Sequence, residues 1–192
     1  YAQKEFTEGN IQYNIYVNNS QSPEGTYIIS VKGGNIKRML SMNNGYNNVT
    51  VYIAKTGKTL SLNENNQQKY ALEMNQEEVS EKNKKFSNAN FKNLNEKKII
   101  SGYNCMSATV TYQNADNVQI YYTNELLPPT QNFNAMFPGL QGIALEYEVK
   151  NNNNTSMKFV ANKIDLSPVD SKIFNIPADY KIVTKAELEQ LK

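Results

Sequence analysis

The sequence predicts a mainly β protein, with one large, curved antiparallel sheet that forms a half-open barrel and about two short helices. Apolar and polar residues alternate with a period of two along much of the chain, as they do from Ile11 to Val17. This pattern places one face of a strand in a core and the other in water. Turn-forming pairs such as Gly33-Gly34 and Asn44-Gly45 separate the alternating stretches, and such pairs are typical of hairpins.

The order of these stretches predicts an antiparallel meander. A run of asparagines at positions 151–154 predicts one of the later turns, because asparagine favours turn conformations. No repeat or linker divides the chain, so we expect a single domain over residues 1–192. The expected strands are residues 11–17, 26–31, 35–42, 49–53, 59–62, 69–74, 91–96, 98–100, 106–112, 118–122, 143–149, 157–161 and 181–183.

Two capping boxes predict the helices. Asn75 followed by Glu78 predicts a surface helix over about Gln76–Lys84, and Thr184 followed by Glu187 predicts a short helix at the C-terminus, because each pair can satisfy the free N–H groups of a first turn. The sheet must bury one face. It could do so as a closed barrel, as a sandwich, or as a half-open barrel with helices plugging the concave side.

The charge balance and the missing residue types exclude several classes of function. The net charge is +2, from 20 basic and 18 acidic residues, whereas a dedicated nucleic-acid binder shows a strong basic bias. Histidine is absent and there is one cysteine, which removes the usual general base, the commonest metal ligand and an intrachain disulfide. No apolar run approaches the ~18 residues of a membrane-spanning helix. We therefore expect no metal, no cofactor, no nucleic-acid partner and no transmembrane helix.

Cys105 is a candidate nucleophile only if a base or a positive environment activates its thiol. The alternation places it on the strand face of Tyr103 and Ser107, opposite Met106 and Ala108. Since the chain has no histidine to activate the thiol, we interpret Cys105 as a packed structural residue.

Tyrosines and carboxylates also admit a functional interpretation. Glu146 and Glu148 share one face of a single strand, and nothing brings an acid pair together as a glycosidase requires. An enzyme that uses serine, lysine or carboxylates would need titratable residues converging in a cleft, so we expect a non-enzymatic protein. Five tyrosines could stack on a ligand ring or simply pack in the sheet: Tyr103, Tyr112, Tyr121, Tyr122 and Tyr147.

The segment from Leu126 to Leu140 is unusually apolar for a loop. Its prolines and Gly139 prevent it from continuing as a central strand. Loops of this length and composition often act as lids or binding elements. The alternative is that Phe133, Met136 and Phe137 plug the open end of the sheet. Both interpretations place the segment beside the mouth of a cavity.

Four segments in a fixed order resemble the motifs of an uncharacterised family of Gram-negative envelope proteins, the GLPGLI-like proteins. Residues 98–110 are similar to a K-x-I-x-G-Y-x-C-x-x-A-x-V core, and residues 118–123 resemble the strand that follows it. Residues 137–146, F-P-G-L-Q-G-I-A-L-E, are similar to the G-L-P-G-L-x-L-E element. Residues 173–180 resemble the closing F-x-I-P-x-G-Y signature, with Asp179 where glycine is frequent.

This resemblance implies an exported protein of the periplasm or outer membrane, often with a lipid anchor. Because the chain begins at Tyr1 rather than methionine, we expect that a signal peptide has been removed. The implied fold is similar to that of the LolA-like lipoprotein carriers, a half-barrel around a hydrophobic cavity that binds acyl chains in the wider group. The resemblance carries over no catalytic residue.

Two hypotheses for function follow. In the first, the protein holds a lipid or another apolar molecule on the concave face of the sheet. In the second, it is a protein- or glycan-interaction module of the envelope without a ligand cavity, marked by a filled core and an exposed patch of tyrosine and asparagine. The ligand-binding residues expected for the first are Met106, Val110, Tyr112, Val118, Ile120, Phe133, Met136, Phe137, Leu140, Ile143, Leu145, Met157 and Phe159.

Overall fold

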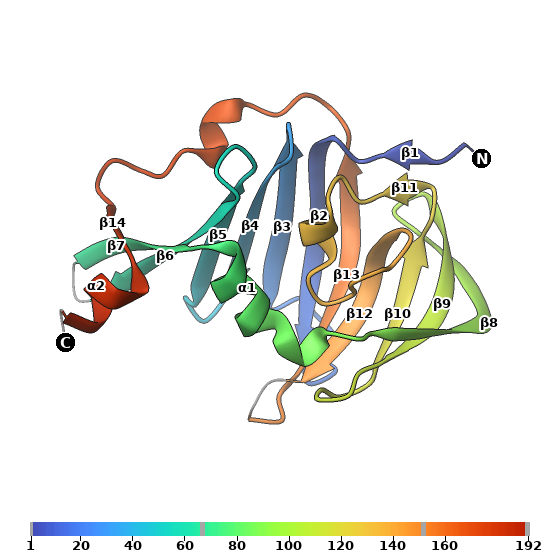
Figure 1. Cartoon of the computed structure of the whole chain (residues 1–192). Helices are drawn as coiled ribbons and strands as arrows, with labels where there is room; N and C mark the ends of the chain where they lie inside the picture. The colour runs from blue at the N-terminus through green and yellow to red at the C-terminus, as the bar shows by residue number, and fades with distance from the viewer. Residues whose placement is uncertain (1, 66–67, 151–152, 191–192) are drawn as a thin grey trace.

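A computed structural model describes residues 2–65, 68–150 and 153–190, and within them twelve strands form one sheet (Figure 1). Along the sheet the strand order is β14-β7-β6-β5-β4-β3-β2-β13-β12-β10-β9-β8. The bounds are β2 (Glu8–Val17), β3 (Gly25–Lys32), β4 (Asn35–Met42), β5 (Asn47–Ile53), β6 (Lys58–Asn65), β7 (Gln68–Met74), β8 (Asn90–Ile100), β9 (Tyr103–Thr111), β10 (Val118–Thr123), β12 (Ile143–Lys150), β13 (Ser156–Asp165) and β14 (Lys181–Val183).

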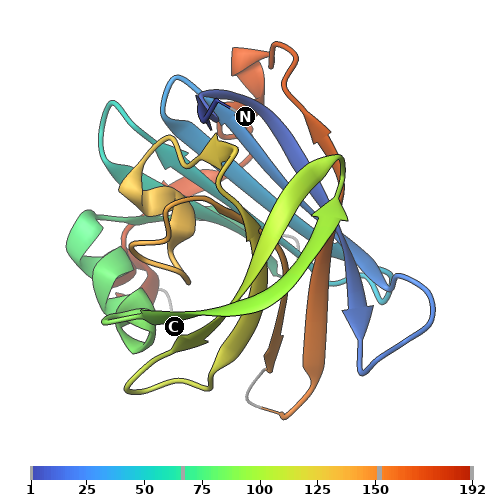
Figure 2. The ribbon, with the colours of Figure 1, turned by 90° about the vertical axis from the view of Figure 1, so that its right-hand side faces the viewer.

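The sheet is open and strongly curved, which confirms the predicted half-open barrel. Its order begins at β14 and ends at β8, and Figure 2 shows β8, β9 and β10 curling around one side of the molecule. The two halves of the chain meet where β2 pairs with β13, from Met157 opposite Val17 to Asp165 opposite Asn10. This pairing joins the N-terminal meander of β2 to β7 to the strands of the second half.

Two details of the sheet differ from the sequence prediction. The last strand, β14, runs parallel to β7, because residues 166–180 cross the sheet before β14 begins. The stretches expected at 91–96 and 98–100 form one long strand, β8, whose register against β9 shifts between Asn93 and Lys97. A bulge of this kind lets a strand bend without ending.

The local signals in the sequence are confirmed where the structure describes them. Gly33 and Gly34 have φ of 56° and 80° and connect β3 to β4, as a two-residue hairpin turn requires. Asn75 accepts a hydrogen bond from the Glu78 N–H, and the Glu78 carboxylate accepts one from the Asn75 N–H. The asparagine turn includes Asn151 and Asn152, which lie outside the described residues.

The helices are short and peripheral. The predicted capping boxes begin α1 (Gln76–Asn83) and α2 (Lys185–Gln190), and neither helix contributes a buried residue. The chain through α1 and the 3-10 helix η1 (Lys84–Phe86) connects β7 at one side of the sheet to β8 at the other, crossing the open side (Figure 1).

Apolar side chains pack on both faces of the sheet. The main core lies on the concave face and includes Tyr13, Ile15 and Phe159. On the opposite face, Val51 packs with Val169 and Phe174, from the segment 166–180 that contains the 3-10 helix η3 (Ser171–Phe174). The concave core is completed by a loop, residues 128–142, which Figure 2 shows in gold within the curve of the sheet. We call residues 128–142 the plug loop.

At Gly142, the end of the plug loop lies so close to the backbone of Thr123 that only glycine has room. Its φ is +158°, and a Cβ added there would lie 2.2 Å from the carbonyl oxygen of Thr123. Gly139, in the same loop, has φ of +87° and open space around an added Cβ. The close backbone approach at Gly142 therefore seats the loop against β10.

We predict that Gly142→Ala lowers the free energy of unfolding by about 3 kcal/mol, because backbone atoms must move to admit the Cβ. The matched variant Gly139→Ala should cost only about 1 kcal/mol, the strain of a left-handed residue. Urea denaturation of both variants measures the difference. Equal losses would contradict the close approach.

Candidate binding site

The concave face carries a continuous apolar surface built from facing strands. Strand pairing places Val110 opposite Val118 and Ile120 opposite Tyr147. Tyr147 then pairs with Phe159 across β12 and β13, and their rings stack with centroids 4.9 Å apart at 12°. Period-two alternation brings these side chains to one face, so the predicted wall of the site is a contiguous surface.

The plug loop covers this surface with its own apolar side chains. Phe133, Phe137 and Leu140 are buried. The Phe137 ring packs edge-on against Tyr147 at 5.3 Å between centroids, and Phe133 packs against Phe6 at 5.9 Å. The sequence left open whether this segment plugs the sheet or acts as a lid, and in this structure its side chains fill the concave side.

A few polar contacts hold the plug loop in place. The Arg38 Nη2 donates to the Phe133 carbonyl at 2.9 Å, and the Tyr112 hydroxyl donates to the Met136 carbonyl at 2.5 Å. The Asn134 Nδ2 donates to the Gly142 carbonyl at 3.0 Å, within the loop. Arg38 and Tyr112 come from opposite parts of the sheet, so the loop is fastened on two sides.

The N-terminal segment closes over the start of the loop. Strand β1 (Lys4–Glu5) pairs in parallel with β11 (Leu126–Leu127), and the Phe6 N–H donates to the Leu127 carbonyl at 2.9 Å. The Phe6 side chain is only 1% exposed. No sequence pattern indicated this pairing, because each strand is two residues long.

All thirteen predicted ligand-binding residues belong to the concave cluster, either buried in it or packed against it. The residues on the strands and those on the plug loop contact one another and do not face an empty chamber. Their role in binding a ligand stays a prediction. The buried members are Val110, Val118, Ile120, Phe133, Phe137, Leu140, Ile143, Leu145 and Phe159. Those partly buried are Met106, Tyr112, Met136 and Met157.

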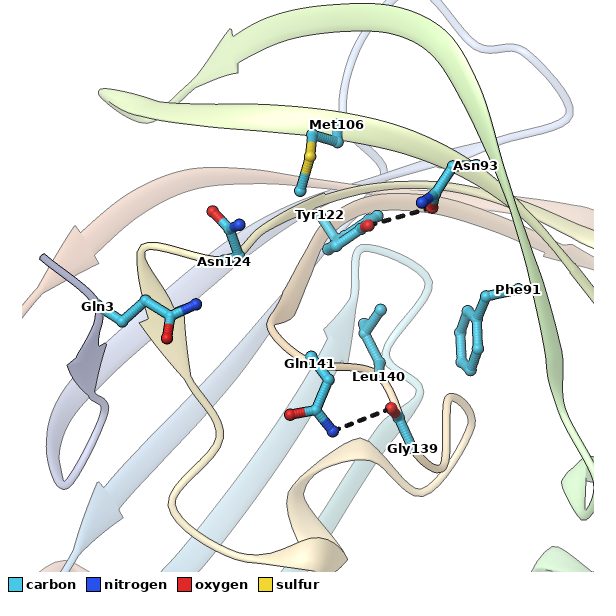
Figure 3. A pocket seen from close by; sticks show the side chains of 9 residues that line it. All are labelled: Gln3, Phe91, Asn93, Met106, Tyr122, Asn124, Gly139, Leu140 and Gln141. Atoms are coloured by element: carbon cyan, nitrogen blue, oxygen red, sulfur yellow. Dashed lines mark hydrogen bonds between the residues drawn. The ribbon is translucent and has the colours of Figure 1, made fainter. Parts of the chain in front are cut away.

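A cleft of about 330 Å³ remains at the mouth of the concave side, between β8 to β10, the N-terminal segment and the end of the plug loop (Figure 3). Within it the Tyr122 hydroxyl donates to the Asn93 Oδ1 at 3.2 Å, and the Gln141 Nε2 donates to the Gly139 carbonyl at 3.3 Å. Small-molecule sites begin at about this size. The lining residues are Gln3, Phe91, Asn93, Met106, Tyr122, Asn124, Gly139, Leu140 and Gln141. We call this space the mouth cleft.

The lining of the mouth cleft combines polar and apolar side chains and carries no charge. Four side-chain amides line it, from Gln3, Asn93, Asn124 and Gln141, and no charged residue is among the lining. Each amide both donates and accepts hydrogen bonds, and Phe91, Met106 and Leu140 add apolar surface. Of the lining residues, Met106 and Leu140 were predicted as ligand-binding residues, and Tyr122 was one of the tyrosines that could stack on a ligand or pack in the sheet. Nothing local to the amide residues pointed to this site.

The other candidate residues have structural partners. The Glu146 carboxylate lies between two ammonium groups, 2.5 Å from Lys98 Nζ and 3.0 Å from Lys158 Nζ. The Lys98 ammonium also lies 3.7 Å from the centroid of the Tyr121 ring. Among the described residues, no group of three or more cysteine, aspartate or glutamate side chains could hold a metal ion. No helix of the described chain has the length and apolarity to cross a membrane.

Cys105 is buried, and burial raises the pKa of its thiol to about 11. Its Sγ lies 3.6 Å from the Tyr103 carbonyl. A thiol with this pKa carries very little thiolate at neutral pH. The position suits the packed structural residue that the sequence predicted.

We predict that iodoacetamide alkylates native Cys105 at pH 8 at least about 100-fold more slowly than it alkylates the chain unfolded in urea, because the raised pKa alone removes about that factor of thiolate. Mass spectrometry at timed intervals measures both rates. Comparable rates would show an exposed, activated thiol.

We also predict a loss of stability at alkaline pH. Burial raises the pKa of Tyr13 and of Tyr147 well above the ordinary 10. Above pH 10 the unfolded chain releases these two protons while the folded chain keeps them, so the free energy of unfolding falls as pH rises, by about 1.4 kcal/mol per pH unit for each tyrosine. Urea denaturation between pH 8 and 11 should show this fall, to which the raised pKa values of Tyr27, Tyr112 and Cys105 also contribute, and Tyr147→Phe should make the fall shallower by the share of one tyrosine. An unchanged slope in the variant would contradict the assignment.

Comparison with known proteins identifies structures with a similar fold but shows no family for this chain. No protein-family model matches the chain, and no curated protein matches it. A structure of PNGF-II is similar over 96% of this chain with 15% identity and a TM-score of 0.51. The match covers 33% of PNGF-II, so the chain spans about a third of that protein's length. The same sheet architecture therefore recurs within a larger protein.

Other solved structures are similar at lower scores. MucB of Pseudomonas aeruginosa, in complex with MucA, matches 94% of this chain and 60% of its own, with 12% identity and a TM-score of 0.47. The Mycobacterium tuberculosis lipoprotein LppX matches 85% of this chain and 89% of its own, with 10% identity and a TM-score of 0.43. A LolA superfamily protein from Nitrosomonas europaea matches 91% of this chain and 92% of its own, with 8% identity and a TM-score of 0.36. At these identities a likeness concerns the fold alone.

Proposed function

We propose that this protein is a non-enzymatic component of the bacterial envelope that binds an apolar or amphiphilic molecule on the concave face of its sheet. The observation that carries the proposal is the way this face is filled. Its apolar surface is covered through Phe133, Phe137 and Leu140 by a loop that contains a single turn of 3-10 helix, η2 (Gln131–Asn134), and no strand. Displacing such a loop breaks few backbone hydrogen bonds, whereas displacing a strand would break a ladder of them.

The binding energy would come from burial of the ligand against the surface that the plug loop now covers. Apolar burial contributes about 25 cal/mol per Å² before the costs of association. The ligand would replace the contacts of Phe137 with Tyr147 and those of the neighbouring loop side chains. Its apparent affinity would therefore equal its intrinsic affinity multiplied by the fraction of molecules in which the loop is displaced, so a rarely displaced loop means weak binding.

The mouth cleft suggests the polar end of the ligand. Its four amide side chains offer donors and acceptors without net charge, next to Leu140 at the edge of the plug loop. An amphiphile with an uncharged polar head would place that head in the cleft and its apolar part under the loop. The envelope location rests on the resemblance of residues 98–110, 137–146 and 173–180 to the GLPGLI-like motifs, which also implies export and, in many members, a lipid anchor.

A second candidate function is an interaction module that binds another envelope protein or a glycan without opening. The filled concave core supports it, because a module of this kind needs no chamber. The two candidates differ in one physical property, the displacement of the plug loop by a ligand.

We predict that Tyr112→Phe binds the neutral probe N-phenyl-1-naphthylamine about fivefold more tightly than the unaltered protein. The substitution removes the hydrogen bond to the Met136 carbonyl, and a loss of about 1 kcal/mol raises the open fraction by that factor. Probe fluorescence, with competition by monoolein, gives the dissociation constants. Tyr121→Phe is the matched control, since that tyrosine lies beside Lys98 away from the loop.

Saturable binding that responds to Tyr112→Phe and not to Tyr121→Phe would support the proposal. Absence of probe binding to the unaltered protein and to both variants would contradict it and favour the interaction module. Urea denaturation of both variants shows whether a gain in binding reflects the tether or general unfolding.

A further inference from the structure

A second cavity lies on the opposite face of the sheet, far along the strand order from the mouth cleft. It has a volume of about 490 Å³, within the range of small-molecule sites. Its residues come from the β4–β5 turn, from β5 and β6, and from the segment that precedes β14. They are Gly45, Tyr46, Asn47, Asn48, Val49, Leu62, Asn63, Glu64 and Tyr180.

The strand register explains how this cavity is built. Val49 pairs with Leu62, and both pack with the small core on the face covered by the segment 166–180. Because side chains alternate along a strand, Asn47 and Glu64 share that face, at the ends of the same two strands. The cavity therefore combines apolar residues with an amide and a carboxylate.

Two tyrosines belong to the cavity and come from segments far apart in sequence. Tyr46 follows the turn at Gly45 and is 58% exposed, one of the few large apolar side chains so open to solvent. Tyr180 belongs to the crossing segment, and its N–H donates to the Pro177 carbonyl. A tyrosine at such a position offers an aromatic face and a hydroxyl to a ligand.

The charged groups around the cavity already interact with one another within the protein. The Lys69 ammonium lies 2.9 Å from an Asp179 carboxylate oxygen and 3.8 Å from a Glu64 carboxylate oxygen. It also lies 5.7 Å from the centroid of the Tyr180 ring. A cationic ligand would have to compete with Lys69 for both the carboxylates and the ring, so an uncharged ligand fits the site better.

We infer that this cavity is a binding site for an uncharged saccharide. A sugar ring presents C–H groups on its face and hydroxyls at its edge. Tyr46 and Tyr180 supply aromatic surface for the face, while the Asn47 amide and the Glu64 carboxylate supply partners for the hydroxyls. The site does not depend on displacement of the plug loop, so it stands or falls separately from the proposed apolar ligand.

The experiment is an NMR titration of the whole chain with cellotetraose, maltotetraose, chitotetraose and mannotetraose, each up to about 20 mM, a concentration that detects even millimolar affinity. At least one saccharide should shift the backbone resonances of residues 45–49, 62–64 and 180 in a saturable way. Tyr46→Ala and Tyr180→Ala should each weaken that binding at least tenfold. Tyr16→Ala is the control, because Tyr16 lies on β2, outside the cavity.

Tyr46 is mostly exposed, so Tyr46→Ala is expected to fold, and its spectrum verifies this directly. The inference is overturned if none of the four saccharides shifts these resonances. It is also overturned if the shifts map to other residues, or if Tyr46→Ala and Tyr180→Ala bind as tightly as Tyr16→Ala.

Discussion

The structure depends on how an open, curved sheet buries its concave face. A closed barrel fills its interior from its own strands, but this sheet stops at β14 and β8. Long helices could cover the face, yet α1 buries no residue. The plug loop therefore supplies the missing apolar layer, and the stacked pair of Tyr147 and Phe159 has Phe137 as its neighbour. The contact between Phe137 and Tyr147 completes the core, and an apolar ligand would have to displace it.

Both faces of the sheet bury their apolar side chains in a similar way. Irregular segments cover both of them, the plug loop on the concave side and residues 166–180 on the other. Each covering segment leaves a cavity at its margin, one lined by amides and one containing two tyrosines. Candidate sites therefore arise where loops end against the sheet, which is where proteins commonly place binding residues on a rigid scaffold.

Local features of the fold could be predicted from the sequence because their causes are local. Gly33-Gly34 defines its hairpin and Asn75 with Glu78 defines its helix start, since a few adjacent residues determine each geometry. The apolar character of residues 126–140 likewise placed that loop at the mouth. The mouth cleft could not be predicted, because Gln3, Asn93 and Gln141 come from three distant segments. The parallel pairing of β14 depends on the path of a long crossing segment, which no periodicity reports.

The pairing of β2 with β13 has a consequence for how the chain acquires its structure. It joins residues 10–17 to residues 157–165, whereas within the meander each strand from β2 to β7 pairs with the next strand in sequence. Contacts between distant segments form slowly, because a long loop must close before they do. While the ribosome is still making the second half, the nascent meander carries β2 as an unpaired edge, the kind of edge on which strands of other chains can add. A strand at the centre of the finished sheet is thus an exposed edge during synthesis, as β7 is until β14 has been made.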